Sequence, residues 1–159
     1  MNRHFLAVIL AFSINAAWAD TNSNPLPDSK LTPGVTNPKV TAQSIDVTIC
    51  VPGYTKTIRP PASFTDQLKK KQIKQYGYKD RNPSHYEEDH LISLELGGNP
   101  TDPKNLWPQP RNIAMGAAQK DKLENELHKR VCAKQITLHE AQHEIATDWV
   151  GAYKKYGVH

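Results

Sequence analysis

The stretch of sequence that decides the fold reads Tyr86-Glu87-Glu88-Asp89-His90-Leu91-Ile92-Ser93-Leu94-Glu95-Leu96-Gly97-Gly98, and Asn105-Leu106-Trp107-Pro108 follows it after a loop rich in proline and aspartate. In this stretch an acid and a histidine precede an apolar run, two glycines end the run, and an asparagine opens a second run. We expect residues 91–96 to form a strand, the two glycines to turn the chain, and a second strand to begin at Asn105.

Helical periodicity marks the next segment, residues 116–131. Leu123, Leu127 and Val131 recur at four-residue spacing and predict a helix with a buried stripe. Asp121 and Glu124 lie three residues apart, so the same helix presents both carboxylates on a neighbouring face. One helix can therefore contact the core and also offer acids to a site.

These motifs together resemble the HNH, or ββα-metal, endonuclease family. More narrowly, they are similar to a small secreted bacterial subgroup in which a Tyr-Glu-x-Asp-His-Leu segment precedes Asn-Leu-Trp-Pro and a helix with Lys-Asp-x-Leu-Glu, here Lys120-Asp121-Lys122-Leu123-Glu124. The resemblance covers residues 50–149. It implies an α+β fold, with a small ββα-metal core and additional helices, and a metal-dependent endonuclease that hydrolyses phosphodiester bonds of nucleic acids.

Each residue of the motif has an expected role. His90 is the predicted general base, because imidazole has an unperturbed pKa near ~6.5 and is largely neutral at working pH. Asp89 would give a carboxylate to a hard divalent ion. The resemblance implies that Asn105 orients His90, directly or through the loop, and that Asp121 or Glu124 supplies a ligand from the helix. Mg²⁺ or Mn²⁺ is the expected ion, with Zn²⁺ as the alternative.

Two features of the chain depart from the compact members of that family. Adjacent side chains on a regular strand point to opposite faces, so Asp89 and His90 share a site only if the strand ends or bulges there. The position that corresponds to the final metal ligand of the compact members holds Ala114, which cannot bind a metal ion. The choice of the further ligand therefore stays open between Asp121 and Glu124.

The charge of the chain suits a polyanionic partner without identifying one. The formal net charge is +4 at pH 7, and the lysines of residues 69–74 are interpreted as a solvated helix face. Arg59, beside two prolines, and Lys120 are the candidate phosphate contacts. We expect a monomer whose partner is a nucleic acid, with DNA favoured over RNA and with no membrane contact once the signal peptide is removed.

The N-terminus has the features of a secretory signal peptide. A basic start, a short apolar stretch and Ala17-Trp18-Ala19 predict cleavage after Ala19 and export to the periplasm or the medium. Residues 20–44 are expected to be a flexible leader, and residues 45–159 the folded domain, which opens with a strand over residues 45–49. Cys50 and Cys132 are the only cysteines, and they predict one disulfide in an oxidising compartment.

The sequence leaves two alternatives to the nuclease hypothesis. His139-Glu140-Ala141-Gln142-His143 matches the His-Glu-x-x-His signature of zinc metallopeptidases. However, Glu140 also completes a capping box with Thr137, and only His159 remains downstream as a third zinc ligand. The second alternative is a nucleic-acid or envelope binding module that keeps the fold and lacks the chemistry.

Overall fold

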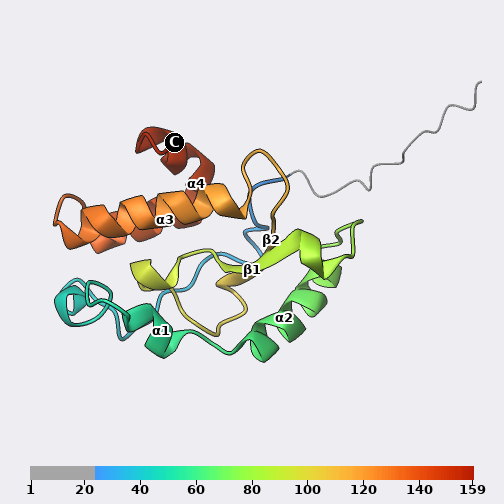
Figure 1. The fold of residues 1–159 in the computed structure, drawn as a ribbon, viewed down its shortest axis with the longest axis horizontal. Coiled ribbons are helices and arrows are strands. Elements are labelled where there is room, and N and C mark those ends of the chain that lie inside the picture. Colours follow the sequence, from blue (N-terminus) through green and yellow to red (C-terminus); the bar gives the residue numbers. More distant parts are fainter. Residues whose placement is uncertain (1–23) are drawn as a thin grey trace, which may run out of the picture.

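The structure is a computed structural model that describes residues 24–159, and it combines helices with a small antiparallel sheet, as expected (Figure 1). Within these residues there are four α-helices and two strands. The helices are α1 (Tyr54–Ile58), α2 (Ala62–Gln75), α3 (Ala117–Cys132) and α4 (Leu138–Lys155), and the strands are β1 (Tyr86–His90) and β2 (Leu106–Pro110). Short 3₁₀ helices are η1 (Ile45–Val47), η2 (Pro83–His85) and η3 (Leu94–Leu96).

The two strands pair so that Asp89 lies opposite Trp107 and His90 lies opposite Leu106. The expected strand over residues 91–96 is wrong, because β1 ends at His90 and the apolar run turns into η3. An apolar run that lacks strict alternation does not distinguish a strand from a buried turn.

The side chain of Asn105 accounts for the end of the sheet. Its Oδ1 accepts from the backbone N–H of Ile92 at 3.1 Å, and its Nδ2 donates to the carbonyl of Ile92 at 3.0 Å. The amide thus occupies both backbone groups that a longer strand would pair. Gly98 must approach this contact closely, since a Cβ there would lie 1.7 Å from the carbonyl oxygen of Ile92.

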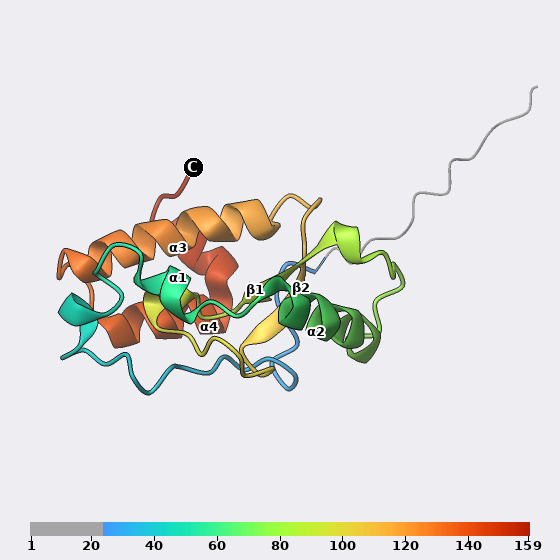
Figure 2. The ribbon, with the colours of Figure 1, turned by 60° about the horizontal axis from the view of Figure 1, so that its bottom comes forward.

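The helices pack in two groups. Helix α2 contacts both strands, whereas α3 and α4 contact each other and η3; Figures 1 and 2 place α3 and α4 together, away from α2. The helix predicted over residues 116–131 is confirmed as α3, and its stripe is buried as expected. The main core includes Leu123, Leu127, Val131, Ile145 and Trp149, and a smaller cluster beside α2 contains Ile73, Tyr78 and Tyr86.

Residues 24–44 lack regular helix or strand but pack on the domain, so the expected flexible leader is corrected for this part of the chain. Val40 is 5% exposed and belongs to the main core. The backbone N–H of Asn37 donates to the carbonyl of Gly97 at 2.8 Å. Trp149 donates from its indole Nε1 to the carbonyl of Pro25 at 2.8 Å. Hydrogen bonds of this kind hold an apolar-poor segment in place, and composition does not reveal them.

The start of the expected domain also differs from the prediction. The strand expected over residues 45–49 is wrong, because Ile45 lies in the 3₁₀ helix η1 and both Ile45 and Ile49 are buried while Val47 is exposed. The sulfur atoms of Cys50 and Cys132 lie 2.01 Å apart, as expected for a disulfide. The disulfide therefore ties the turn after η1 to the last residue of α3.

The signal peptide expected over residues 1–19 lies outside the described residues. Among the helices of residues 24–159, none combines the length and the apolar character that a membrane span requires.

A pair of valine substitutions tests the packing of residues 24–44. Val40→Ala is expected to lower the free energy of unfolding by about 2 kcal/mol, because it removes buried methyl groups from the core. Val47→Ala is the matched control, since Val47 is 76% exposed and should change stability by less than about 0.5 kcal/mol. Urea denaturation of both variants gives the comparison. Equal stabilities would contradict the docking of this segment.

Candidate functional site

Three carboxylates converge where β1 ends against α3. Asp89 comes from the strand, and Asp121 and Glu124 come from the first half of the helix. One oxygen from each lies within 4.8 Å of the others. The helical spacing that predicted a shared face for Asp121 and Glu124 therefore also brings them to the acid at residue 89.

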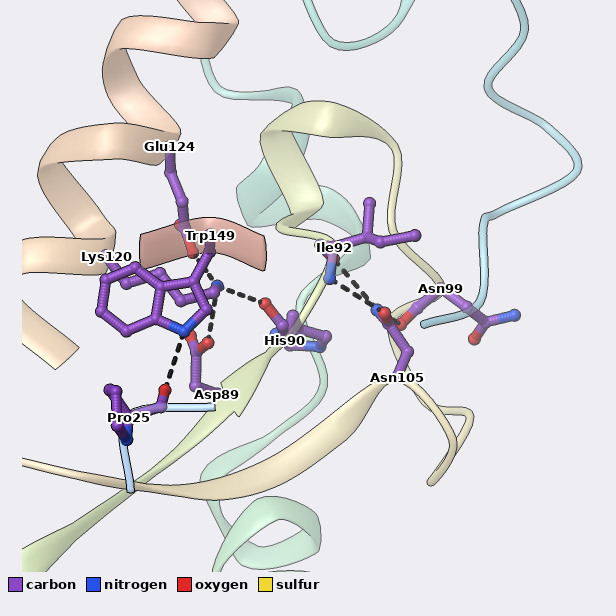
Figure 3. Close-up of polar contacts among 9 residues, drawn as sticks. All are labelled: Pro25, Asp89, His90, Ile92, Asn99, Asn105, Lys120, Glu124 and Trp149. Carbon is purple, nitrogen blue, oxygen red and sulfur yellow. Dashed lines mark hydrogen bonds and ion pairs between the residues drawn. The ribbon is translucent and has the colours of Figure 1, made fainter. Parts of the chain in front are cut away.

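Lys120 lies inside this group of acids and is fully buried (Figure 3). Its Nζ donates to Asp89 Oδ2 at 2.7 Å, to the carbonyl oxygen of His90 at 2.8 Å, and to Glu124 Oε1. An ammonium has three donors, and all three are used here. The expected role of Lys120 as a phosphate contact is therefore corrected: its ammonium is out of reach of a ligand, and it holds the strand to the helix instead.

The charges of this cluster do not cancel. Burial alone would favour the neutral amine, but the carboxylates of Asp89 and Glu124 hold the pKa of Lys120 above its ordinary value. Burial raises the pKa of Glu124 to about 8, against the opposing charge of Lys120. Burial also raises the pKa of Asp121, and the charge of Asp89 adds to that shift. Three ionised acids around one ammonium would thus repel one another, and a proton on Glu124 relieves part of this repulsion.

The oxygens that Lys120 leaves free could hold a divalent cation. Asp89 and Glu124 each give one oxygen to the ammonium. Among residues 24–159, the Asp121 carboxylate makes no hydrogen bond or ion pair within contact distance. Carboxylate oxygens are the ligands that Mg²⁺ and Mn²⁺ prefer. The donor set therefore fits such an ion on the outer side of the cluster, where it would offset the repulsion among the acids.

His90 follows Asp89 at the last position of β1, and its side chain is 6% exposed. Its Nε2 lies 3.0 Å from the carbonyl oxygen of Pro100. A carbonyl only accepts, so Nε2 carries the proton in this contact and Nδ1 is the nitrogen left to accept one. Burial lowers the pKa of His90. The ring is therefore neutral at pH 7, as a general base requires.

No hydrogen bond of the described residues joins the side chains of Asn105 and His90, but Asn105 bonds to the loop that contacts His90 (Figure 3). Its Nδ2 donates to the carbonyl of Asn99 at 3.0 Å, and the next residue, Pro100, accepts from the His90 ring. Asn105 is fully buried, and its hydrogen bonds connect it to the His90 ring through this loop.

Arg59 and the acids of α3 share a hollow of about 280 Å³. Arg59 is exposed at the C-terminal end of α1, and Asp121 and Glu124 line the hollow from α3. Ser93 and Glu95, which sequence reasoning did not select, also line it. The positions of Ser93 and Glu95 depend on the turn at η3. The sequence analysis predicted a strand over this segment and therefore did not place these two residues at the site.

The residues of the peptidase signature do not form a comparable cluster. His139 and His143 are exposed, with stacked rings 6.4 Å apart between centroids. Within residues 24–159, the two groups of three candidate metal ligands are the acid cluster and one of Cys50, His128 and Cys132, and neither includes these histidines. The second group has both sulfurs in the disulfide. The described part of the chain thus offers no third ligand beside His139 and His143.

The chain matches no protein-family model, no curated protein and no solved structure. The site is therefore interpreted from its own geometry.

Removal of the buried ammonium tests the centre of the cluster. Lys120→Met is expected to lower the free energy of unfolding at pH 7 by about 3 kcal/mol, because the half-buried carboxylates of Asp89 and Glu124 lose their partner. Lys122→Met is the matched control, since Lys122 is exposed on the same helix. Guanidinium denaturation provides the measurement. A Lys120→Met protein as stable as the control would contradict the central position of the ammonium.

Glu88, the residue before Asp89, is a second buried acid. Neither of its carboxylate oxygens has a hydrogen-bond partner among the described residues. Burial raises the pKa of Glu88 from 4.5 to about 8, and the charge of Asp89 adds to the shift. Between these two pH values the folded protein keeps a proton that the unfolded chain releases. Stability must therefore fall as the pH rises through this range.

Glu88→Gln should remove the part of this pH dependence that comes from Glu88. The free energy of unfolding of the parent is expected to fall between pH 5 and 8, with a contribution from Glu88 of about 4 kcal/mol, and the decline in the variant should be smaller by about that amount. Denaturation at several pH values gives the slopes. Glu140→Gln, at an exposed position, should keep the slope of the parent. An unchanged slope in Glu88→Gln would contradict the burial of this acid.

Proposed function

We propose that this chain is an exported, metal-dependent endonuclease that hydrolyses phosphodiester bonds of nucleic acids. The observation that carries the proposal is the meeting of Asp89, Asp121 and Glu124 within 4.8 Å, beside a neutral histidine whose Nε2 is held by a backbone carbonyl. Cleavage of a phosphodiester needs a group that accepts a proton from water and a cation that offsets charge on phosphoryl oxygens. The site supplies the first and can hold the second.

The ββα order supports the family resemblance. Strands β1 and β2 are antiparallel and are followed by α3, with the acid and the histidine at the end of β1 and the further acids on the helix. Adjacent side chains of a strand point to opposite faces, and in this proposal Asp89 and His90 can serve one site because β1 ends at His90. Asp89 then turns toward α3 while His90 is held by the loop that carries Pro100.

Each residue has a defined task in this proposal. His90 takes a proton from the attacking water at Nδ1, and Asn105 keeps the ring in place through the loop. Asp89, Asp121 and Glu124 would hold Mg²⁺ or Mn²⁺, which stabilises negative charge on the phosphate when bound. Lys120 keeps Asp89 and Glu124 together before the ion arrives.

The substrate is a nucleic acid, with DNA favoured over RNA, and sequence preference should be weak. Sequence is recognised through base contacts, and nothing in the described residues forms a separate recognition module for them. The N-terminal signal sequence and the disulfide support export to the periplasm or the medium.

A binding module without chemistry is the second candidate, and Lys120 is the observation that favours it. All three donors of the ammonium are satisfied inside the acid cluster, in a place where a cation would otherwise bind. If the ammonium fully replaces the ion, the protein binds nucleic acid and does not cut it.

A cleavage assay separates these functions. Supercoiled plasmid and single-stranded RNA are incubated with the mature protein in Mg²⁺ or Mn²⁺, and we expect cuts that a chelator abolishes and added metal restores. His90→Ala should lower the rate at least about 100-fold, because the general base is lost. His143→Ala, at an exposed histidine, should cut at the rate of the parent.

The outcome distinguishes the alternatives. A His90→Ala protein that is folded by circular dichroism and cuts like the parent would refute the assignment of the base. Retarded but uncut plasmid identifies the binding module. Zinc-dependent casein hydrolysis that is lost in Glu140→Ala identifies the peptidase.

A further inference from the structure

The hollow beside the acid cluster is formed by three separate elements. Thr55 and Arg59 line it from α1, Ser93 and Glu95 from the start of η3, and Asp121 and Glu124 from α3. Its volume of about 280 Å³ is sufficient for a phosphate group with its neighbouring atoms. Two of its possible hydrogen-bond donors, Arg59 and Ser93, have side chains without partners among residues 24–159.

The first such group is the guanidinium of Arg59. Among residues 24–159 its side chain makes no hydrogen bond or ion pair, although three acids lie around the hollow. It lines the hollow together with Glu95, Asp121 and Glu124. The planar guanidinium is suited to bidentate contact with phosphate oxygens.

The second group is the hydroxyl of Ser93. Ser93 is 3% exposed, and its Oγ is buried without a hydrogen-bond partner in the described chain. A buried hydroxyl without a partner is unfavourable, and most such groups in folded proteins are satisfied. Because Ser93 lines the hollow, its hydroxyl is a donor that a ligand bound there could use.

We propose that this hollow binds the phosphoryl group of a phosphate ester, with Arg59 and Ser93 as donors to its non-bridging oxygens. The inference rests on the proposed function, because the acids that line the hollow repel an anion unless a divalent cation offsets their charge. Phosphate should therefore bind tightly only in the presence of Mn²⁺ or Mg²⁺. Arg59 and Ser93 would fix the ester beside the ion that Asp121 and Glu124 hold.

Calorimetry on the mature protein tests this phosphate site, formed by Arg59 and Ser93, without any cleavage of the ligand. Inorganic phosphate, and separately a short single-stranded oligonucleotide, are titrated into the protein with and without Mn²⁺. Arg59→Ala should weaken both ligands at least about tenfold, the loss expected for one charge-assisted hydrogen bond, and Arg59→Lys should recover part of the affinity. Ser93→Ala should weaken both by several-fold. Lys56→Ala, on an exposed lysine of α1 outside the hollow, should bind both ligands like the parent.

Two further readouts exclude a merely structural effect. The affinity for Mn²⁺ alone should change less than about threefold in Arg59→Ala and Ser93→Ala, because neither residue is a metal ligand in the proposal. Ser93→Ala should melt at the same or a higher temperature than the parent, since it removes an unsatisfied hydroxyl.

The possible results separate this inference from the function itself. If Arg59→Ala and Ser93→Ala bind phosphate and the oligonucleotide like the parent, the proposed phosphate site is wrong, even if the parent cuts nucleic acid. A second result is that the parent binds phosphate only with metal and that both variants lose this binding. If the parent also never cuts nucleic acid, the phosphate site is supported and the proposed nuclease function is refuted. Binding of phosphate but not of the oligonucleotide limits the ligand to free phosphate or a small ester and overturns the nucleic-acid assignment of the phosphate site.

Discussion

The structure depends on one buried ammonium, that of Lys120, and on the three oxygens around it. The contact joins the end of β1 to α3, and these two elements contribute every acid of the site. A buried charge is stable only when it is paired. If the strand and the helix moved apart, the Lys120 ammonium would lose its partners, which is unfavourable. The same contact that organises the acids also limits how much positive charge a bound metal ion can add.

Asn105 plays the corresponding part for the loop between the strands. Its side chain imitates a segment of strand for Ile92 and holds the carbonyl of Asn99, so the polypeptide turns sharply after His90 and returns beside the imidazole. The turn uses Gly97 in a left-handed conformation at φ 74° and the absence of a side chain at Gly98. Gly97, Gly98 and Asn105 therefore act together to form this turn.

The sequence predicted what depends on periodicity and missed what depends on distant partners. The stripe of Leu123, Leu127 and Val131 identified α3, because helical spacing survives without knowledge of the rest of the fold. The apolar run after His90 was assigned to a strand, since its turn is imposed by Asn105. Lys120 was predicted to contact phosphate, because the strand acid that pairs with it lies 31 residues away in the sequence. The acids of the site were found from helical spacing and motif, and Ser93 was not.

The bond from the Trp149 indole to the Pro25 carbonyl spans 124 residues of sequence. Contacts of such separation form only after a large loss of chain entropy, and they cannot form while the last helix is still inside the ribosome. The hydrogen bond that joins Pro25 to the domain can therefore form only after α4 has been synthesised. Until then, the carbonyl of Pro25 lacks this partner.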